Sequence, residues 1–330
     1  MVEDKTATPP RGWMQEGSPF HEGEIQVQAR LGVRERMEGI GRKVIRDHMP
    51  DQHRTFYQQL PWIFIGAVDD LGQPWASVIT GEPGFISSPE PTSLHIHSTL
   101  IENDPLTVSL QAGRPVGLLG IELPTRRRNR VNGHITQVTS EGLQISVTQS
   151  FGNCPKYIQA RSAEGDRPEI NQVASPILAE HLLPHDRELI ANADTFFVAS
   201  YSGSSRGASA GVDVSHRGGK PGFVRVDDDG TLTVPDFVGN SFYNTIGNLM
   251  TAPQAGLLFP DLQTGDLLYL AVTAEVVWEG PEVDAFLGAQ RLLRFRVKRT
   301  VRLNGALRAK WQDPELSPFL TKTGEWLRQS

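Results

Sequence analysis

A glycine followed by short polar residues stands at the start of a helix that the sequence predicts over residues 241–252. The first N–H groups of a helix have no partner within it, so a phosphate can accept hydrogen bonds from them and from nearby hydroxyl or amide groups. The alternative is ordinary capping of the helix by the same side chains. Asn248 follows one turn later and shares a helix face with Asn244. The candidate phosphate-binding residues are Gly239, Asn240, Ser241, Asn244 and Thr245.

A glycine-bounded polar run precedes this group and contains Ser215, Arg217 and Lys220. An arginine presents a planar fork of donors that matches a phosphate or a carbonyl group. Composition alone favours the alternative, a solvated hairpin. The run therefore predicts an anion contact only in combination with other signals.

The densest basic cluster of the chain comprises Arg126, Arg127, Arg128 and Arg130. It predicts an anion site, for a cofactor phosphate or for a phosphorylated substrate such as a nicotinamide nucleotide. The alternative is a solvated hairpin tip with Asn129 at its turn.

Cys154 is the single cysteine of the chain, and Lys156 follows two residues later. A catalytic nucleophile needs a base close by in space, and most single cysteines only fill space in a core. We therefore expect the segment around Cys154 to lie near a ligand rather than to form a covalent intermediate.

Metal and nucleotide motifs are missing from the sequence. His95 and His97 lie on one face of a predicted strand, but no third ligand accompanies them, so no metal is expected. The sequence contains no GxGxxG and no GxxxxGK[ST] motif; the pattern GxSxG occurs at 203–207 and 207–211, but in a glycine- and serine-rich run that leads into a further strand rather than as a nucleophile elbow before a helix. A Rossmann dehydrogenase, a P-loop nucleotide hydrolase and an α/β-hydrolase are therefore disfavoured.

Length and composition indicate an ordinary globular protein. The 330 residues suffice for two domains, and a net charge of −6 argues against a nucleic-acid binder. We expect neither a membrane span nor a signal peptide, because no apolar run is long enough. One cysteine excludes an intrachain disulfide and suits a reducing compartment. The expected localisation is cytoplasmic.

An internal repeat organises the chain. The tripeptide Pro-Gly-Phe occurs at residues 83–85 and again at 221–223, each after an apolar strand and before further strands. A repeat of this length indicates duplicated domains rather than a solenoid. The other matching segments are 62–67 with 195–200, 93–97 with 231–234, 114–119 with 253–258, and 131–135 with 272–276.

Short strands separated by turns about every ten residues predict β-barrels. The turns include 69–72 and 227–230. Asp51 is the expected N-cap of a helix over 51–60, and the polar stretch 163–176 is the expected linker. Other predicted helices cover 24–46, 104–112, 185–192 and 323–328. The predicted division is 1–50 N-terminal extension, 51–162 first barrel, 163–184 linker, 185–312 second barrel and 313–330 tail.

Three segments together resemble the FMN-binding split-barrel proteins related to pyridoxamine 5'-phosphate oxidase. They are residues 213–226, residues 234–249 and the block Asn153-Cys154-Pro155-Lys156-Tyr157. The resemblance extends over about residues 55–310 and is most specific at 213–248 and 150–158. It implies a mainly β fold with flanking helices (α+β), made of two tandem split β-barrels and an N-terminal helical extension.

The resemblance also implies that FMN binds between the barrels, with its phosphate beyond the strand that ends near Asp236. Gly239, Asn240 and Ser241 then occupy the phosphate loop. Lys220, Gly222 and Phe223 would line the edge of the isoalloxazine ring, where a glycine permits close approach of the backbone. The oxidase carries a basic pair just after its loop serine, and the equivalent residues here are Ser241 and Phe242. This departure argues against the vitamin B6 enzyme itself.

The function implied is an FMN-dependent oxidoreductase that draws electrons from NAD(P)H or a redox partner protein and acts on a small molecule. The alternative is a non-catalytic carrier of flavin or a tetrapyrrole on the same fold. Because the repeats differ around the phosphate loop, one flavin per chain is expected. The two barrels could form one pseudo-dimer or pair again as a homodimer.

Overall fold

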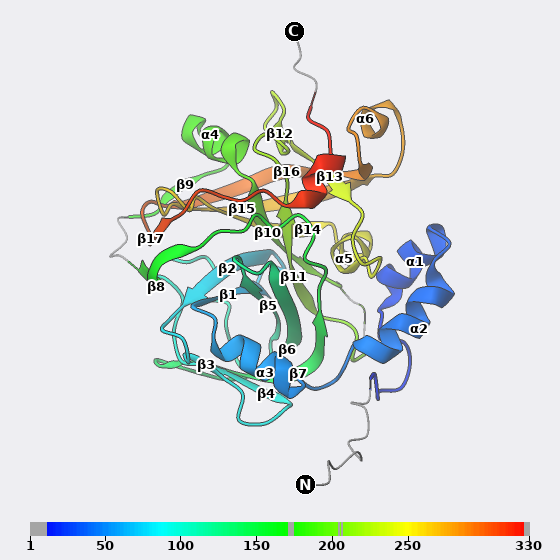
Figure 1. Cartoon of the computed structure of the whole chain (residues 1–330), viewed down its shortest axis with the longest axis vertical. Helices are drawn as coiled ribbons and strands as arrows, with labels where there is room; N and C mark the ends of the chain where they lie inside the picture. The colour runs from blue at the N-terminus through cyan, green and yellow to red at the C-terminus, as the bar shows by residue number, and fades with distance from the viewer. Residues whose placement is uncertain (1–11, 171–174, 204, 206, 327–330) are drawn as a thin grey trace.

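The computed structural model describes residues 12–170, 175–203, 205 and 207–326, without the side chains of 164–170 and 308–310. Two antiparallel sheets form most of the fold, which is mainly β with flanking helices (Figure 1). The first contains β1 (Trp62–Val68), β2 (Pro74–Thr80), β3 (Ile86–Ser87), β4 (Ser93–Ile96), β5 (Pro115–Glu122), β6 (Arg127–Thr139) and β7 (Gly142–Gly152). The second contains β10 (Thr195–Tyr201), β11 (Val212–Gly218), β12 (Arg225–Val226), β13 (Leu232–Phe237), β14 (Gln254–Pro260), β15 (Leu267–Val277) and β16 (Ala289–Leu303).

The strand order confirms the duplication that the sequence predicts. The order is β2-β1-β5-β6-β7-β4-β3 in the first sheet and β11-β10-β14-β15-β16-β13-β12 in the second. Every strand of the first sheet therefore has a counterpart in the same place in the second. The short strand β9 (Ile177–Ala179) adds to the second sheet beside β16. The two sheets are the split barrels of a tandem pair.

The two barrels pack against each other through equivalent strands. Phe64 of β1 stacks on its counterpart Phe197 of β10, with ring centroids 3.5 Å apart. Gly117 of β5 lies against the backbone of Val212 in β11, where a Cβ would collide, and Gly256 of β14 meets Pro74 of β2 in the same way. These reciprocal contacts describe a pseudo-two-fold interface, and the main core continues across it.

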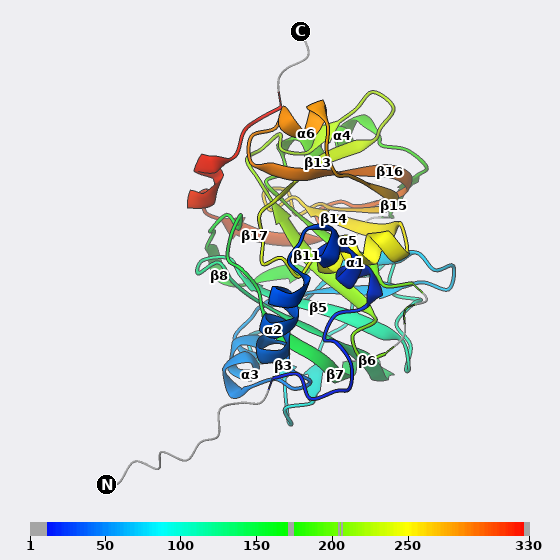
Figure 2. The same cartoon turned by 90° about the vertical axis from the view of Figure 1, so that its right-hand side faces the viewer.

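The N-terminal segment forms two helices, not the single helix predicted over 24–46. They are α1 (Glu22–Arg30) and α2 (Arg34–Val44). The chain reverses between them at Gly32, whose φ of 66° is readily reached only by glycine. Figure 2 shows α1 beside α5 (Asn244–Thr251), and Gly23 and Gly247 allow the two backbones to approach closely.

Three other predictions need correction. Helix α3 (Asp51–Gln58) is present, but its N-cap is Pro50, and Asp51 pairs with Arg54. Residues 104–112 form turns, in which the Thr107 and Ser109 N–H groups bond to the carbonyls of Asp104 and Leu106, three residues back, rather than four as in an α-helix. A 3₁₀ helix at Pro318–Lys322 stands in place of the helix predicted over 323–328, whose last two residues lie outside the described ones.

The stretch predicted as a linker contains a strand, β8 (Ala163–Ile170), which pairs with β17 (Leu307–Trp311) at one edge of the molecule. Helix α4 (Pro184–Asn192) matches the helix predicted over 185–192, and α6 (Pro281–Asp284) is a short addition. None of the helices in the described ranges is long and apolar enough to cross a membrane.

Candidate functional site

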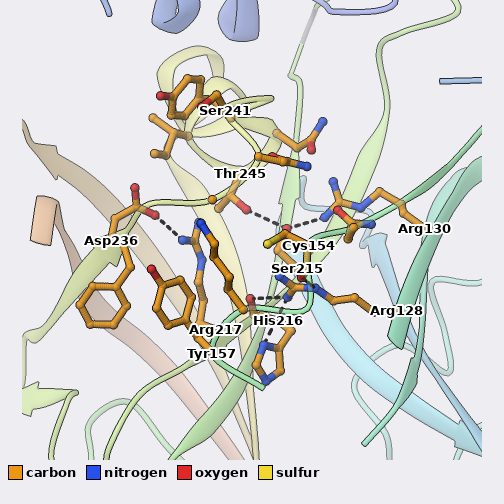
Figure 3. Close-up of a pocket in the computed structure, with 18 of the residues that line it drawn as sticks. Arg128, Arg130, Cys154, Tyr157, Ser215, His216, Arg217, Asp236, Ser241 and Thr245 are labelled. Carbon is orange, nitrogen blue, oxygen red and sulfur yellow. Dashed lines mark hydrogen bonds and ion pairs between the residues drawn. The ribbon is translucent and has the colours of Figure 1, made fainter. Parts of the chain in front are cut away.

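A cavity of about 110 Å³ opens between the two barrels, beside the start of α5. Its walls come from β6 of the first barrel, from β11 and β13 of the second, and from the segment 153–157 (Figure 3). Among the lining residues are Arg128, Arg130, Cys154, Tyr157, Ser215, Arg217, Asp236, Ser241 and Thr245. The repeat thus brings residues more than 80 positions apart into one site.

Arg130 crosses from the first barrel into the second. Its side chain is 3% exposed, and its Nη1 donates to Asp213 Oδ1 at 2.8 Å. Its Nη2 donates to the Val214 carbonyl at 2.8 Å and to Ser215 Oγ at 2.5 Å. Arg130 Nε has no hydrogen-bond partner among the described residues. One buried donor of this arginine is therefore left for a ligand or a water molecule.

Arg128 lies one step along the same face of β6, and its recorded partners are not carboxylates. Its Nε donates to the Cys154 carbonyl at 2.7 Å, and its Nη1 lies 3.3 Å from His216 Nδ1. Burial, together with the neighbouring Arg130 and Arg217, lowers the pKa of Arg128 to about 10, although Cys154 opposes the shift. Arg128 is still charged at pH 7, and an anion in the cavity would relieve this repulsion.

His216 accepts this hydrogen bond as a neutral ring. Burial, and then the positive charges of Arg128, Arg217 and Arg161, hold its pKa well below the usual value for a histidine. At neutral pH the ring therefore adds no charge and acts as a support for Arg128.

Arg217 of β11 faces Asp236 of β13, with which it forms an ion pair. Asp236 also pairs with Arg291 of β16 at 2.7 Å, so one carboxylate serves two guanidinium groups. Arg217 Nε has no partner in the described part of the chain. Together with Arg128, this shared carboxylate leaves a surplus of positive charge at the cavity.

The start of α5 closes the cavity from the second barrel. Thr245 Oγ1 donates to Ser215 Oγ at 2.9 Å, so Ser215 accepts from both Thr245 and Arg130. Ser241 and Tyr243, which precede the helix, have φ values of 65° and 64°. Tyr157, in the facing segment, has a φ of 64°.

Three of the five described non-glycine residues with positive φ thus line one cavity. Such backbone strain costs about 1–3 kcal/mol per residue and concentrates at functional sites.

Helix α1 supports α5 from behind. The Glu24 carboxylate accepts from the Asn244 amide and from the His21 backbone N–H at 2.9 Å. Burial, and then the negative charge of Asp213, raise the pKa of Glu24 well above the usual value. Asn248 reaches the other oxygen of Asp213 at 3.1 Å, which connects α5 to the Arg130 pair.

The structure gathers most of the predicted site residues around this cavity. They are Ser215, Arg217, Asp236, Gly239, Asn240, Ser241, Asn244, Thr245, Arg128, Arg130, Cys154 and Lys156.

Four predicted residues lie elsewhere. Lys220 pairs with Glu325 at 3.1 Å, and Gly222 is the positive-φ residue of the turn beside it. Phe223 is buried in the second barrel's core against Phe196. Arg126 is held by Glu315 and the Ile158 carbonyl.

Sequence reasoning missed the polar residues that hold the site together. Asp213 begins the run from which Ser215 and Arg217 were chosen, but its partner Arg130 is 83 residues away. Tyr157 belongs to the Asn-Cys-Pro-Lys-Tyr block that carried the resemblance, and its hydroxyl donates to the Val238 carbonyl at 3.2 Å. For Asn132, which donates to Asp213 at 2.8 Å, no sequence signal was available.

The described residues contain no group of three or more His, Cys, Asp or Glu side chains arranged to hold a metal ion. His97, one of the two histidines considered for metal binding, lies 3.0 Å from Ser87 Oγ.

The fold and the cavity define a tandem split-barrel protein with an arginine-lined cavity between its barrels. Comparison with family models finds no match, and neither does comparison with curated proteins.

Several solved structures are similar in part. HupZ of Group A Streptococcus has 16% identity and a TM-score of 0.28, covering 36% of this chain and 90% of its own. A protein provisionally named pyridoxamine 5'-phosphate oxidase from Lactobacillus delbrueckii has 12% identity and a TM-score of 0.29, covering 37% and 94%. HutZ, the heme storage protein from Vibrio cholerae, has 15% identity and a TM-score of 0.26, covering 38% and 96%.

Proposed function

We propose that this protein binds FMN between its two barrels and acts as an FMN-dependent oxidoreductase. Its electrons would come from NAD(P)H or a redox partner protein and pass to a small molecule. The observation that carries the proposal is the convergence of Arg128, Arg130 and Arg217 on one cavity, where two of their Nε donors have no partner in the described structure.

The donor set suits a phosphate monoester dianion. Guanidinium groups and hydroxyls form short, charge-assisted hydrogen bonds with phosphate oxygens, and Ser215 and Thr245 stand beside the arginines. The start of α5 adds backbone N–H groups. Arg128 is the main phosphate ligand in this proposal, because its recorded partners leave its charge unpaired.

The cavity volume limits what fits without movement. About 110 Å³ takes a phosphate group, whereas ligand pockets for molecules of FMN size usually measure about 300 Å³ or more. Segments 153–157 and 239–243 must therefore shift to admit the ring. The strained residues Tyr157, Ser241 and Tyr243 lie on these two segments, so opening can relieve strain as well as cost contacts.

When bound, FMN supplies hydride and one-electron chemistry. The protein's own residues would orient it: Arg128 and Arg217 hold the phosphate, and Arg130 keeps β6 fixed to β11 through Asp213. His216 stays neutral and holds Arg128 in place. No residue is assigned as a proton donor.

The test is an FMN titration followed by visible absorbance and fluorescence quenching, with Arg128→Gln as the variant. Loss of a charge-assisted hydrogen bond costs about 1.5–3 kcal/mol, so the Kd for FMN should rise about tenfold to a hundredfold. The matched control is Arg36→Gln, an exposed arginine on α2, which should leave the Kd unchanged. A parent protein that takes up no FMN, or a variant with the parent's Kd, would overturn the assignment.

A non-catalytic flavin or tetrapyrrole carrier is the second candidate. It is favoured by the buried position of His216, the one histidine among the lining residues, whose ring is neutral and bonded to Arg128. Anaerobic addition of NADH or NADPH to the FMN-loaded protein separates the two. Bleaching of the flavin by either nucleotide supports the oxidoreductase, whereas bleaching only by dithionite supports the carrier. Heme serves as a second binding probe.

A further inference from the structure

Cys154 lies in the wall of the cavity rather than in a core. It is a free thiol of intermediate exposure, and it borders the same space as Arg128, Arg130 and Arg217. Figure 3 draws its sulfur among the side chains of these arginines and Ser215. A cysteine in this place can react with a disulfide that enters the cavity.

The surroundings of the thiol select the charge of that molecule. Arg128 and Arg217 bring the positive charge described above, and Lys156 lines the cavity as well. Arg130, 97% buried, has an unpartnered Nε in this wall, a second and independent sign that an anionic or acceptor group belongs here. Asp236 is the acidic side chain among the lining residues, and two arginines neutralise it.

From this arrangement we propose that Cys154 is a thiol–disulfide exchange site specific for small anionic disulfides, and that its modification closes the anion site. The inference rests on the anion site of the proposed function, but not on FMN being its occupant. The added group would occupy the volume of about 110 Å³ that a phosphate otherwise takes. Reduction by a thiol would reopen the site.

The exchange balances without a further reagent. The Cys154 thiol releases its proton to solvent, and its sulfur attacks one sulfur of the disulfide. The disulfide bond of the reagent breaks, a new S–S bond to Cys154 forms, and the other half leaves as a thiolate. Cys154 is oxidised, and the departing half is reduced.

The experiment uses two disulfide probes that each release a coloured thiol on exchange. Because the chain has one cysteine, this release reports on Cys154. The anionic probe is 5,5'-dithiobis(2-nitrobenzoate), and the neutral probe is 4,4'-dithiodipyridine. Because the same thiol attacks both probes at the same pH, the ratio of the two rate constants, compared with the ratio in the unfolded chain, measures the charge preference of the site. The reference ratio comes from the chain unfolded in urea.

The expected ratio, anionic over neutral, is at least tenfold higher in the folded protein than in the unfolded one. Inorganic phosphate at millimolar concentration should lower the anionic rate at least threefold, and sodium chloride of equal ionic strength should lower it less. Arg128→Gln should reduce the ratio, whereas Arg36→Gln should not. The thiolated protein should bind phosphate at least tenfold more weakly, with recovery after dithiothreitol.

Three results would overturn the inference: no reaction of the folded protein with either probe, a ratio equal to that of the unfolded chain, or unchanged phosphate binding after thiolation. The two proposals fail separately. A protein that binds FMN but shows no anionic preference at Cys154 loses only the exchange site. A protein that takes up no FMN, yet shows phosphate protection of Cys154, loses only the flavin assignment.

Discussion

The interface between the barrels contains two regions related by the repeat. The region around Ser215 is a charged cavity, and the region around Ser77 is a buried cluster. Strand register makes Ser215 of β11 the counterpart of Ser77 in β2, and Arg130 of β6 the counterpart of Tyr269 in β15. Around Ser215 there is an open cavity with surplus positive charge. Around Ser77, the Tyr269 hydroxyl donates to Asp104 at 2.9 Å, and Ser77 also donates to Asp104. All three residues are buried.

The other counterparts explain the difference. Arg217 corresponds to Ile79, Arg128 to Leu267, and Asp213 to Trp75. Around Ser77, these three charged side chains of the cavity are thus replaced by apolar ones, each no more than 1% exposed. The same backbone interface forms a charged cavity on one side and a buried, packed cluster on the other. Placement of charges, rather than fold, distinguishes the two halves, and under our proposal it decides which half binds a ligand.

The strongest test of this contrast removes the charge that crosses the interface at the cavity. Arg130→Met leaves Asp213 buried without its ion pair, which should lower the free energy of unfolding by about 3–5 kcal/mol. Urea denaturation monitored by tryptophan fluorescence gives the value. Arg114→Met, which breaks an exposed pair with Asp70, is the control and should cost about 1 kcal/mol or less. If both variants lose the same free energy of unfolding, the buried Arg130–Asp213 pair contributes no more to stability than the exposed pair.

The pH dependence of stability tests the buried cluster around Ser77. Burial is the main cause that raises the pKa of Asp104 to about 6, from 3.8 in the unfolded chain. The folded state therefore holds a proton that the unfolded state releases, so the stability from this group is full below about pH 4 and is lost as the pH rises through 6. Between pH 8 and pH 5 the linkage amounts to about 1.5 kcal/mol.

Asp104→Asn should abolish that part of the pH dependence, and the difference between denaturation curves at pH 5 and pH 8 measures it. Glu141→Gln, an exposed hairpin residue, is the control. A variant that keeps the parent's pH dependence would show that Asp104 is not the titrating group.

The smallest expected effect comes from the hydrogen bond between the hydroxyls of Thr245 and Ser215 in the cavity. Thr245→Val removes the donor to Ser215 Oγ, which should weaken FMN or phosphate binding about fivefold, equivalent to about 1 kcal/mol. The same change at Thr251, whose hydroxyl is bonded to backbone carbonyls at the other end of α5, should leave binding unaffected. Isothermal titration calorimetry distinguishes the two. Matching affinities for both variants would exclude Thr245 from the site.

Sequence reasoning succeeded where the signal is local or repeated. The two Pro-Gly-Phe segments and their flanking strands predicted the duplicated sheets, because hydrophobic pattern and turns fix strands locally. It failed at two helices. Gly32 divides the N-terminal helix in two, and residues 104–112 form turns whose backbone bonds join residues three apart.

The candidate site shows the same division. The arginine cluster could be found from composition, but its use could not. Arg126 and Arg130 differ by four residues in sequence, yet one is held near the C-terminal segment by Glu315 and the other spans the barrels to Asp213. Packing of β6 in the first sheet against β11 in the second places Arg130 beside Asp213, and a contact between residues 83 positions apart is not encoded in local pattern.

The joining of both barrels in one polypeptide has a consequence for dilution. If the halves were separate subunits, the fraction of assembled sites would fall with protein concentration. A covalent connection holds each half at an effective local concentration that dilution cannot lower. The cavity that Arg130 and Ser215 build should therefore stay assembled at nanomolar protein, and it can work in a cell that makes very few copies of the chain.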